Sequence, residues 1–213
     1  MNPNDPRPQL YLITPHIKDA EAGAAALASA LGIADVAAVL LRLADADERT
    51  LINRVKTIAP AAQSKGVALI LDGQPDIVAR CGADGAHLSD PQALKAALPN
   101  LKPDRIAGCG GLKSRHDAMF AGETGADYVM FGEPDAQGSR PSFEAILDRV
   151  GWWAGLFEIP CVAYAASLNE VDELVKAHAE FIAVGDLVFA DPRGPTTAIT
   201  EIAARLVAPE AIS

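Results

Sequence analysis

Eight short apolar runs recur along this chain, and each is followed by a polar loop and a segment with helical spacing of apolar residues. The runs cover residues 10–13, 36–41, 67–71, 85–88, 105–109, 126–131, 161–164 and 181–184. Because the apolar residues are continuous rather than alternating, both faces of each strand should be buried, as in a parallel sheet. Eight strand–helix units in 213 residues predict a single closed (β/α)8 barrel, the TIM barrel.

We expect the whole chain, residues 1–213, to form one domain, with residues 1–8 as a proline-rich, loosely held lead-in. Half of the residues are hydrophobic, which is enough for a sizeable core. The alternative to a barrel is a doubly wound open sheet. That fold usually carries a glycine-rich fingerprint after its first strand, and Thr14-Pro15-His16, which follows the first run, is not one.

Composition narrows the classes of partner. The formal net charge is −10, which argues against a nucleic-acid ligand, because neutralising phosphates along a nucleic acid requires a basic face. It leaves room for a small anionic ligand held by loops and helix N-termini. The beginning of the sequence has no apolar signal core and no window reaches the length of a membrane span. The three cysteines are far apart, so we expect reduced thiols and a cytoplasmic protein with no membrane partner.

The carboxyl ends of parallel strands are where ligands bind in α/β folds. The polar residues and glycines that follow the runs should therefore gather on one rim. The candidate binding residues on this rim are Arg42, Asp72, Gly110, Gly111, Ser139, Arg140, Ala165, Ala166 and Gly185. His87 lies inside a strand pattern, so an interior histidine with its hydrogen bonds satisfied is the favoured interpretation there.

Two carboxylates, Asp72 and Asp90, follow neighbouring strands and are candidate metal ligands. Such a pair can hold Mg²⁺ while the ion keeps waters and binds a diphosphate. The competing interpretation is that Asp90 caps the next helix and Asp72 lies in a turn. Ser139 and Arg140 lie in a glycine-containing loop and can donate hydrogen bonds to phosphate, unless they are simply a solvated part of that loop.

Four motifs together resemble the thiamine phosphate synthase family, which includes a thiazole tautomerase branch. They are LYLITP at 10–15, ADGAHL at 83–88, ADYVMFG at 126–132 and IPCVA at 159–163, and the match follows chain order through all eight units. The resemblance implies a (β/α)8 enzyme that joins hydroxymethylpyrimidine diphosphate to a thiazole phosphate and releases pyrophosphate with Mg²⁺. Its partners would be small phosphorylated heterocycles, and a homo-oligomer stays open because helix faces of such barrels often pair.

The family residues carry over unevenly. The family pattern ADYVGVGPIFPTPTK falls on residues 126–140, so its Thr-Lys becomes Ser139-Arg140. Of the family's Gln-Leu-Arg-Glu-Lys after the second strand, Arg42 remains. The resemblance therefore implies Arg42, Ser139 and Arg140 as the catalytic set. Its metal-binding Asp is absent at its own position, and Asp72 lies one residue earlier.

The remaining losses fall in the last two loops. The family's Gly-Gly in the seventh loop falls on Ala165-Ala166, and its serine in the eighth becomes Asp186. Three interpretations stay open: a thiamine phosphate synthase with impaired activity, a non-catalytic or regulatory paralogue that binds a thiamine-related ligand, and a same-fold enzyme with another small substrate.

Overall fold

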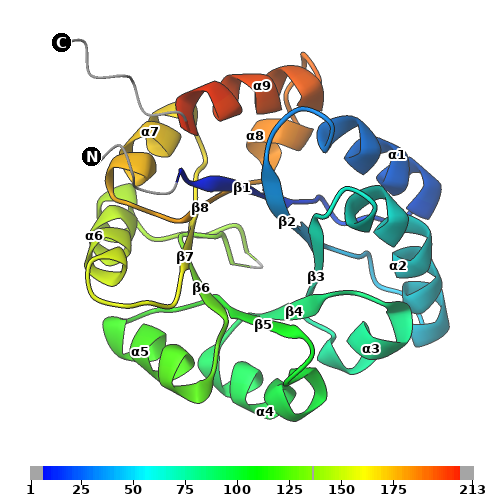
Figure 1. Ribbon diagram of the computed structural model, residues 1–213, viewed down its shortest axis with the longest axis horizontal. Coiled ribbons are helices and arrows are strands. Elements are labelled where there is room, and N and C mark those ends of the chain that lie inside the picture. The colour runs from blue at the N-terminus through cyan, green and yellow to red at the C-terminus, as the bar shows by residue number, and fades with distance from the viewer. Residues whose placement is uncertain (1–6, 136, 207–213) are drawn as a thin grey trace.

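The computed structural model describes residues 7–135 and 137–206 of the chain. Residues 1–6, which make up most of the expected lead-in, lie outside the described residues. Within the described ranges, strands and helices alternate from one end to the other, and Figure 1 shows the strands as an inner ring with helices around it.

All eight expected strands form, and they close into a barrel in chain order. The strands are β1 (Gln9–Ile13), β2 (Val36–Leu41), β3 (Ala68–Asp72), β4 (Gly85–Leu88), β5 (Ile106–Cys109), β6 (Tyr128–Phe131), β7 (Cys161–Tyr164) and β8 (Phe181–Val184). Neighbouring strands are parallel, and β1 pairs with β8, for example Leu12 with Val184. The predicted (β/α)8 barrel is thus confirmed, because an open doubly wound sheet would leave two strands unpaired on one side.

The helices cover the outside of this ring. They are α1 (Ala20–Ala30), α2 (Glu48–Gln63), α3 (Val78–Cys81) after the short 3₁₀ helix η1 (Pro75–Ile77), α4 (Pro91–Leu101), α5 (Arg115–Thr124), α6 (Phe143–Ala154), α7 (Leu168–Lys176), α8 (Asp186–Phe189) and α9 (Pro195–Leu206). The N-cap side chains explain several starts: Asp47 bonds the backbone N–H of Thr50, and Ser167 bonds that of Glu170. The short helix α8 was not expected from the sequence.

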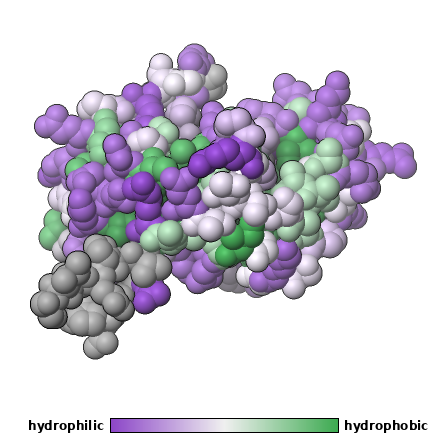
Figure 2. Space-filling view, turned by 90° about the horizontal axis from the view of Figure 1, so that it is seen from above, coloured by the Kyte–Doolittle hydropathy of each residue, from purple (hydrophilic) through white to green (hydrophobic). Residues whose placement is uncertain are grey.

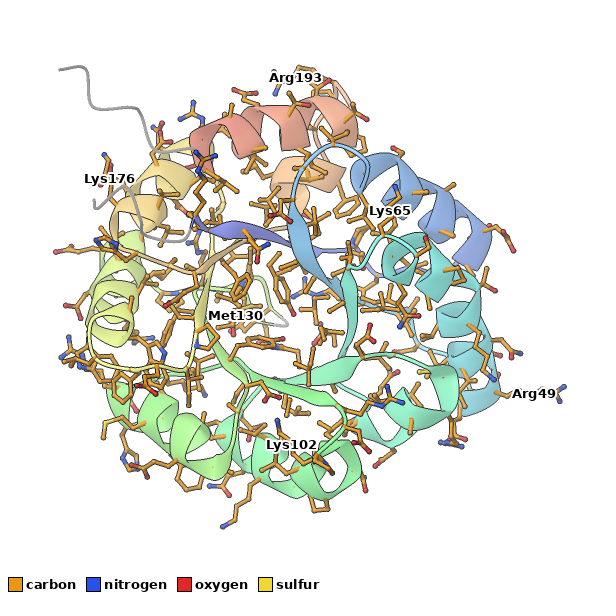
Figure 3. The ribbon with its side chains drawn as sticks, viewed as in Figure 1. Arg49, Lys65, Lys102, Met130, Lys176 and Arg193 are labelled. Carbon is orange, nitrogen blue, oxygen red and sulfur yellow. The ribbon has the colours of Figure 1, made fainter. Side chains whose placement is uncertain are left out.

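Two apolar cores hold the barrel together. The larger lies between the strands and the outer helices, and its biggest fully buried side chain is Trp153 of α6. The smaller fills the ring itself with inward side chains, which include Ile13, Leu40, Met130 and Tyr164. Figure 3 shows Met130 inside the ring, where it helps to close the barrel below its mouth. The interior is therefore packed, and a ligand must bind above it, at the mouth.

The outer surface is predominantly polar on the face that Figure 2 shows, with only small hydrophobic patches. The large hydrophobic residues with the greatest exposure among those described are Ile33, Met119 and Leu156. None of the helices in the described ranges is both long enough and apolar enough for a membrane crossing.

Candidate functional site at the barrel mouth

The mouth is built from the strand ends one layer above the apolar interior. Every second residue of a strand points into the barrel. Arg42, directly after β2, is therefore the next inward residue after Leu40, and Asp72, the last residue of β3, is the next after Ile70. His87 on β4 pairs in register with Asp72. The result is an apolar floor with a polar wall along β2, β3 and β4.

Arg42 and Asp72, two predicted site residues, form an ion pair in this wall. The Arg42 Nε atom donates to Asp72 Oδ2 at 2.9 Å, with 26% and 32% of the two side chains exposed. The Arg42 backbone N–H donates to Thr14 Oγ1 at 3.0 Å, which ties the end of β1 to β2. Among the described residues, no hydrogen-bond acceptor contacts the two terminal nitrogens of Arg42. Its guanidinium is therefore oriented by Asp72 and still has donors for an anionic ligand.

His87 belongs to a buried hydrogen-bonded chain, as the sequence favoured. Its Nδ1 lies 3.0 Å from the hydroxyl of Tyr128, and that hydroxyl lies 2.7 Å from the hydroxyl of Tyr11. Burial lowers the pKa of His87 to about 4, so the imidazole is neutral near pH 7. With Nδ1 of the neutral His87 ring hydrogen-bonded to Tyr128, the Nε2 atom lies toward the mouth, beside Gly110.

Glu133, directly after Gly132 at the end of β6, completes the wall. Its Oε1 accepts a hydrogen bond from the Gly111 backbone N–H at 2.5 Å. Burial raises the pKa of Glu133 to about 7, while Arg42 opposes this rise. A Cβ on Gly110 would overlap with both Glu133 Oε1 and His87 Nε2, so the missing side chain of Gly110 leaves the space that these two groups occupy.

Arg140 and Ser139 lie on the opposite part of the rim, in the β6–α6 loop. The guanidinium of Arg140 binds both carboxylate oxygens of Glu170, with Nη1–Oε2 and Nη2–Oε2 distances of 3.0 Å. The same Glu170 Oε2 accepts the backbone N–H of Ala166 at 2.8 Å. Arg140 also lies over the ring of Tyr164. An internal carboxylate thus occupies the two terminal nitrogens of Arg140, one of the residues expected to hold phosphate.

A cavity of about 290 Å³ opens beside Glu133 and Arg140. Its lining combines Met130 from the floor with Gly111, Glu133, Ser139 and Arg140 from the rim. The loop after β6 reaches over the centre of the ring in the view of Figure 1. The cavity has room for a small heterocycle with polar groups on its edge.

The other predicted site residues have roles in the local backbone. Asp90 caps α4, with its Oδ1 accepting the N–H groups of Gln92 and Ala93 at 2.8 Å. The N–H of Ala165 donates to the carbonyl of Ala183 within the β7–β8 pairing region, and the carbonyl of Gly185 accepts the N–H groups of Val188 and Phe189 in α8. These three residues lie at strand or helix ends on the same side of the barrel as Arg42.

The described ranges contain no group of three or more His, Cys, Asp or Glu side chains suited to hold a metal ion. Asp72 and Asp90 each have one carboxylate oxygen that no protein donor in those ranges contacts. Two carboxylates fit Mg²⁺, since the ion usually takes one or two from the protein and the rest of its ligands from water and substrate phosphates.

Sequence reasoning missed two carboxylates that organise the rim, Glu133 and Glu170. The position of Glu133, directly after a strand-ending glycine, is the signal in the sequence that indicates a residue of the rim. Glu170 has no such signal, because its place in the first turn of a helix is typical of an ordinary helix start. Only the packing of α7 beside the β6–α6 loop brings it to Arg140.

Comparison with known proteins supports one family for the whole chain. Residues 10–188 match the family model described as thiamine monophosphate synthase. The thiamine-phosphate synthase of Rhodospirillum centenum is 40% identical over 196 residues, covering 91% of this chain and 95% of that protein. That of Hyphomonas neptunium is 36% identical over 205 residues, covering 91% of each chain.

Solved structures show the same fold. A thiamine phosphate pyrophosphorylase from Pyrococcus furiosus superposes with a TM-score of 0.78 at 21% identity, covering 95% of this chain and 96% of that one. A 3-hexulose-6-phosphate synthase superposes with a TM-score of 0.71 at 15% identity, covering 92% and 99%. The barrel thus accords with the sequence relatives, and the chain belongs to the thiamine monophosphate synthase family.

Proposed function

We propose that this protein is a thiamine phosphate synthase-type transferase. It joins hydroxymethylpyrimidine diphosphate to a thiazole phosphate and releases pyrophosphate. The observation that carries the proposal is the relationship along the whole chain to thiamine-phosphate synthases, together with an oriented guanidinium at the mouth, Arg42. The replaced family residues predict a slower enzyme than its relatives.

The mouth suits a reaction in which a diphosphate departs and leaves a stabilised pyrimidine cation. Such a step needs electrostatic support for the leaving group more than it needs a base. Arg42 provides donors that Asp72 holds in place, and Ser139, which lines the cavity, adds a hydroxyl group to the rim. Arg140 joins this set when its pair with Glu170 opens. The neutral His87 and the apolar floor leave the cation free of a competing protein charge from below.

Mg²⁺ is part of the proposal, with Asp72 and Asp90 as its protein ligands through their uncommitted oxygens. A divalent cation held there would neutralise charge on the diphosphate. Asp72 then has two roles, because its other oxygen holds Arg42. We also propose that the protein works in the cytoplasm on small molecules alone, since its three cysteines are buried and free.

The first experiment is direct. Purified protein is incubated with both substrates and Mg²⁺, beside the Rhodospirillum centenum enzyme. We expect thiamine phosphate above background at a lower rate than the relative. No product from this protein, with the relative active, would exclude the proposal and favour a non-catalytic paralogue. Restored growth of a thiamine auxotroph that lacks its own synthase would exclude the paralogue.

A second candidate follows from the Arg140–Glu170 pair. Because Glu170 already binds Arg140 and the Ala166 N–H, a phosphate there would have to displace a half-buried carboxylate. An acceptor without that phosphate, such as the thiazole alcohol, needs no displacement. The same barrel would then transfer the pyrimidine to a less phosphorylated substrate.

The two candidates differ in their preferred acceptor. We compare kcat/KM for thiazole phosphate and thiazole alcohol in the wild type and in Glu170→Gln. The transferase proposal expects thiazole phosphate to be preferred, and the neutral glutamine to lower its KM by easing the displacement. Preference for the alcohol in both proteins would support the second candidate.

A further inference from the structure

The carboxyl group of Glu133 has one oxygen committed to the protein and one that is not. Oε1 accepts the Gly111 N–H, whereas no donor in the described parts of the chain contacts Oε2. Glu133 lines the cavity at the mouth, and Oε2 is not among the buried atoms that lack a partner. A fixed acceptor with an accessible second oxygen therefore belongs to the cavity wall.

Two glycines, Gly110 and Gly111, make the position of the Glu133 carboxyl group possible. Gly111 has a φ of +63°, and a Cβ there would overlap with the Ser89 carbonyl, so its N–H direction depends on glycine. Gly110 lacks the side chain that would separate Glu133 from His87. Two adjacent glycines thus leave space for one carboxyl group and one ring on the same side of β5, at the edge of an apolar floor.

The charges around Glu133 exclude some ligand groups. Asp72 raises its pKa and Arg42 lowers it, so both face this side of the mouth. Lys113, Asp135, Arg140 and Arg149 also line the cavity. A carboxylate at this position disfavours phosphate at its own oxygens, so phosphate belongs beside the guanidinium groups of the rim, Arg42 and Arg140. What Oε2 can accept is an N–H or O–H group of a ligand that lies on Met130.

We infer that Glu133 determines specificity by accepting a hydrogen bond from the exocyclic amine of an aminopyrimidine. The inference rests on the proposed function, which supplies such a substrate. A thiazole ring carries no amine, so the pyrimidine is the substrate that fits. The family pattern has proline at this position, which offers no side-chain acceptor, so the pattern does not account for this contact.

The hydrogen bond from the Gly111 N–H determines which way a glutamine at position 133 would be oriented. In Glu133→Gln the amide oxygen stays on Gly111, which turns the amide NH₂ toward the cavity. A donor then stands where the wild type has an acceptor. It opposes the amine and favours a carbonyl, so the variant should invert the ligand preference instead of merely weakening it.

The experiment measures dissociation constants by calorimetry for two uncharged probes. They are the hydroxymethyl aminopyrimidine alcohol and its oxo analogue, which has a carbonyl in place of the amine. The proteins are the wild type, Glu133→Gln and the control Glu123→Gln, which removes an exposed carboxylate at the far end of α5. Thermal unfolding of each protein shows that the variants are folded.

The measurement is made near pH 8.5, above the raised pKa of Glu133, where its carboxyl group is ionised. There we expect the wild type and Glu123→Gln to bind the amino compound about tenfold more tightly or better, which is the scale of a hydrogen bond to a charged group. Glu133→Gln should prefer the oxo compound. The inference is overturned if the wild type shows no preference or binds neither probe, or if Glu133→Gln keeps the wild-type preference.

These outcomes separate the inference from the proposed function. Product formation with no effect of Glu133→Gln on probe preference would leave the transferase standing and remove this role of Glu133. Inverted preference without any thiamine phosphate would show an aminopyrimidine site in a protein with a different reaction.

Discussion

Gly110 shows how much one missing side chain decides at the mouth. Its α-carbon lies beside both Glu133 and His87, and any Cβ there would overlap with the two groups. Their side chains come from β4 and from the loop after β6, on either side of β5. The polar wall therefore depends on glycine at this position for space, not for backbone freedom.

Gly110→Ala should destabilise the protein by about 1–3 kcal/mol, because the added methyl group forces Glu133 or His87 to move. It should also reduce transferase activity. Gly151→Ala is the matched control, since its Cβ would meet nothing within 4 Å on α6, and it should stabilise by about 0.5–1 kcal/mol. Urea denaturation measures both. Equal stability of the two variants would contradict the role of Gly110.

Arg42→Ala should lower kcat/KM for the diphosphate substrate at least about tenfold, as a charge-assisted contact to a leaving group is lost. Arg42→Lys should recover only part of this, because lysine cannot donate to Asp72 and to a diphosphate in the same fork. Arg49→Ala is the control, since Arg49 lies outside the barrel (Figure 3) and should change the rate less than twofold. Steady-state kinetics with Arg42→Ala near wild type would exclude the role of Arg42.

At the scale of elements, helix α4 and its cap decide between two roles for Asp90. The side chain holds two backbone N–H groups of the first turn, which is an ordinary structural role. The proposed Mg²⁺ site needs the other oxygen of the same carboxylate. The two roles are compatible, and they respond differently to substitution.

Asp90→Asn should leave stability within a few tenths of a kcal/mol, because asparagine caps helices about as well as aspartate. If Asp90 binds Mg²⁺, the same variant should raise the Mg²⁺ concentration required for half-maximal activity about tenfold. Asp90→Ala should cost about 1 kcal/mol in addition. An unchanged Mg²⁺ requirement in Asp90→Asn would leave Asp90 as a cap alone.

At the scale of the whole molecule, two partly or fully buried groups make opposite contributions to stability. Glu133 has its pKa raised to about 7, and His87 has its pKa lowered to about 4, both chiefly by burial. As pH rises from about 4.5 to 7, the unfolded chain releases the Glu133 proton first, so the folded state loses stability. As pH rises from about 4 to 6.5, the His87 contribution increases stability instead.

Glu133→Gln removes one of these contributions. The variant should therefore gain stability relative to the wild type between pH 4.5 and 7, on the order of 1–3 kcal/mol. The charged or titratable groups that lie near Glu133 and remain in the variant are Asp72, Arg42, His87, Tyr11, Tyr128 and Cys109. Chemical denaturation at several pH values measures the difference. A difference that stays constant with pH would contradict the burial of an ionisable Glu133.

The continuous apolar runs were sufficient to predict eight parallel strands, and the barrel closure followed from their number. Helices α6, α7 and α2 begin directly after the capping residues Ser142, Ser167 and Asp47. The four-residue α8 has too short a pattern to be recognised.

The sequence predicted which side of the barrel carries the candidate site residues, because strand direction alone determines that. It brought Arg42 and Asp72 to the same wall, and these two residues are in contact. It could not predict that Arg140 binds Glu170, or that Glu133 meets Gly111. Those pairs join residues 30 and 22 positions apart, and no spacing rule along the chain relates them.

The amino-acid sequence by itself determined the barrel and its polar rim, because apolar patterning and strand–helix order each act over a few residues. It also determined the family, through short motifs that follow chain order. Only the tertiary structure decided which donors stay available to a ligand. Hydrogen-bonding groups on separate loops satisfy one another when the barrel closes, as Glu170 does for Arg140. Which atoms remain unpaired is therefore a property of the folded chain.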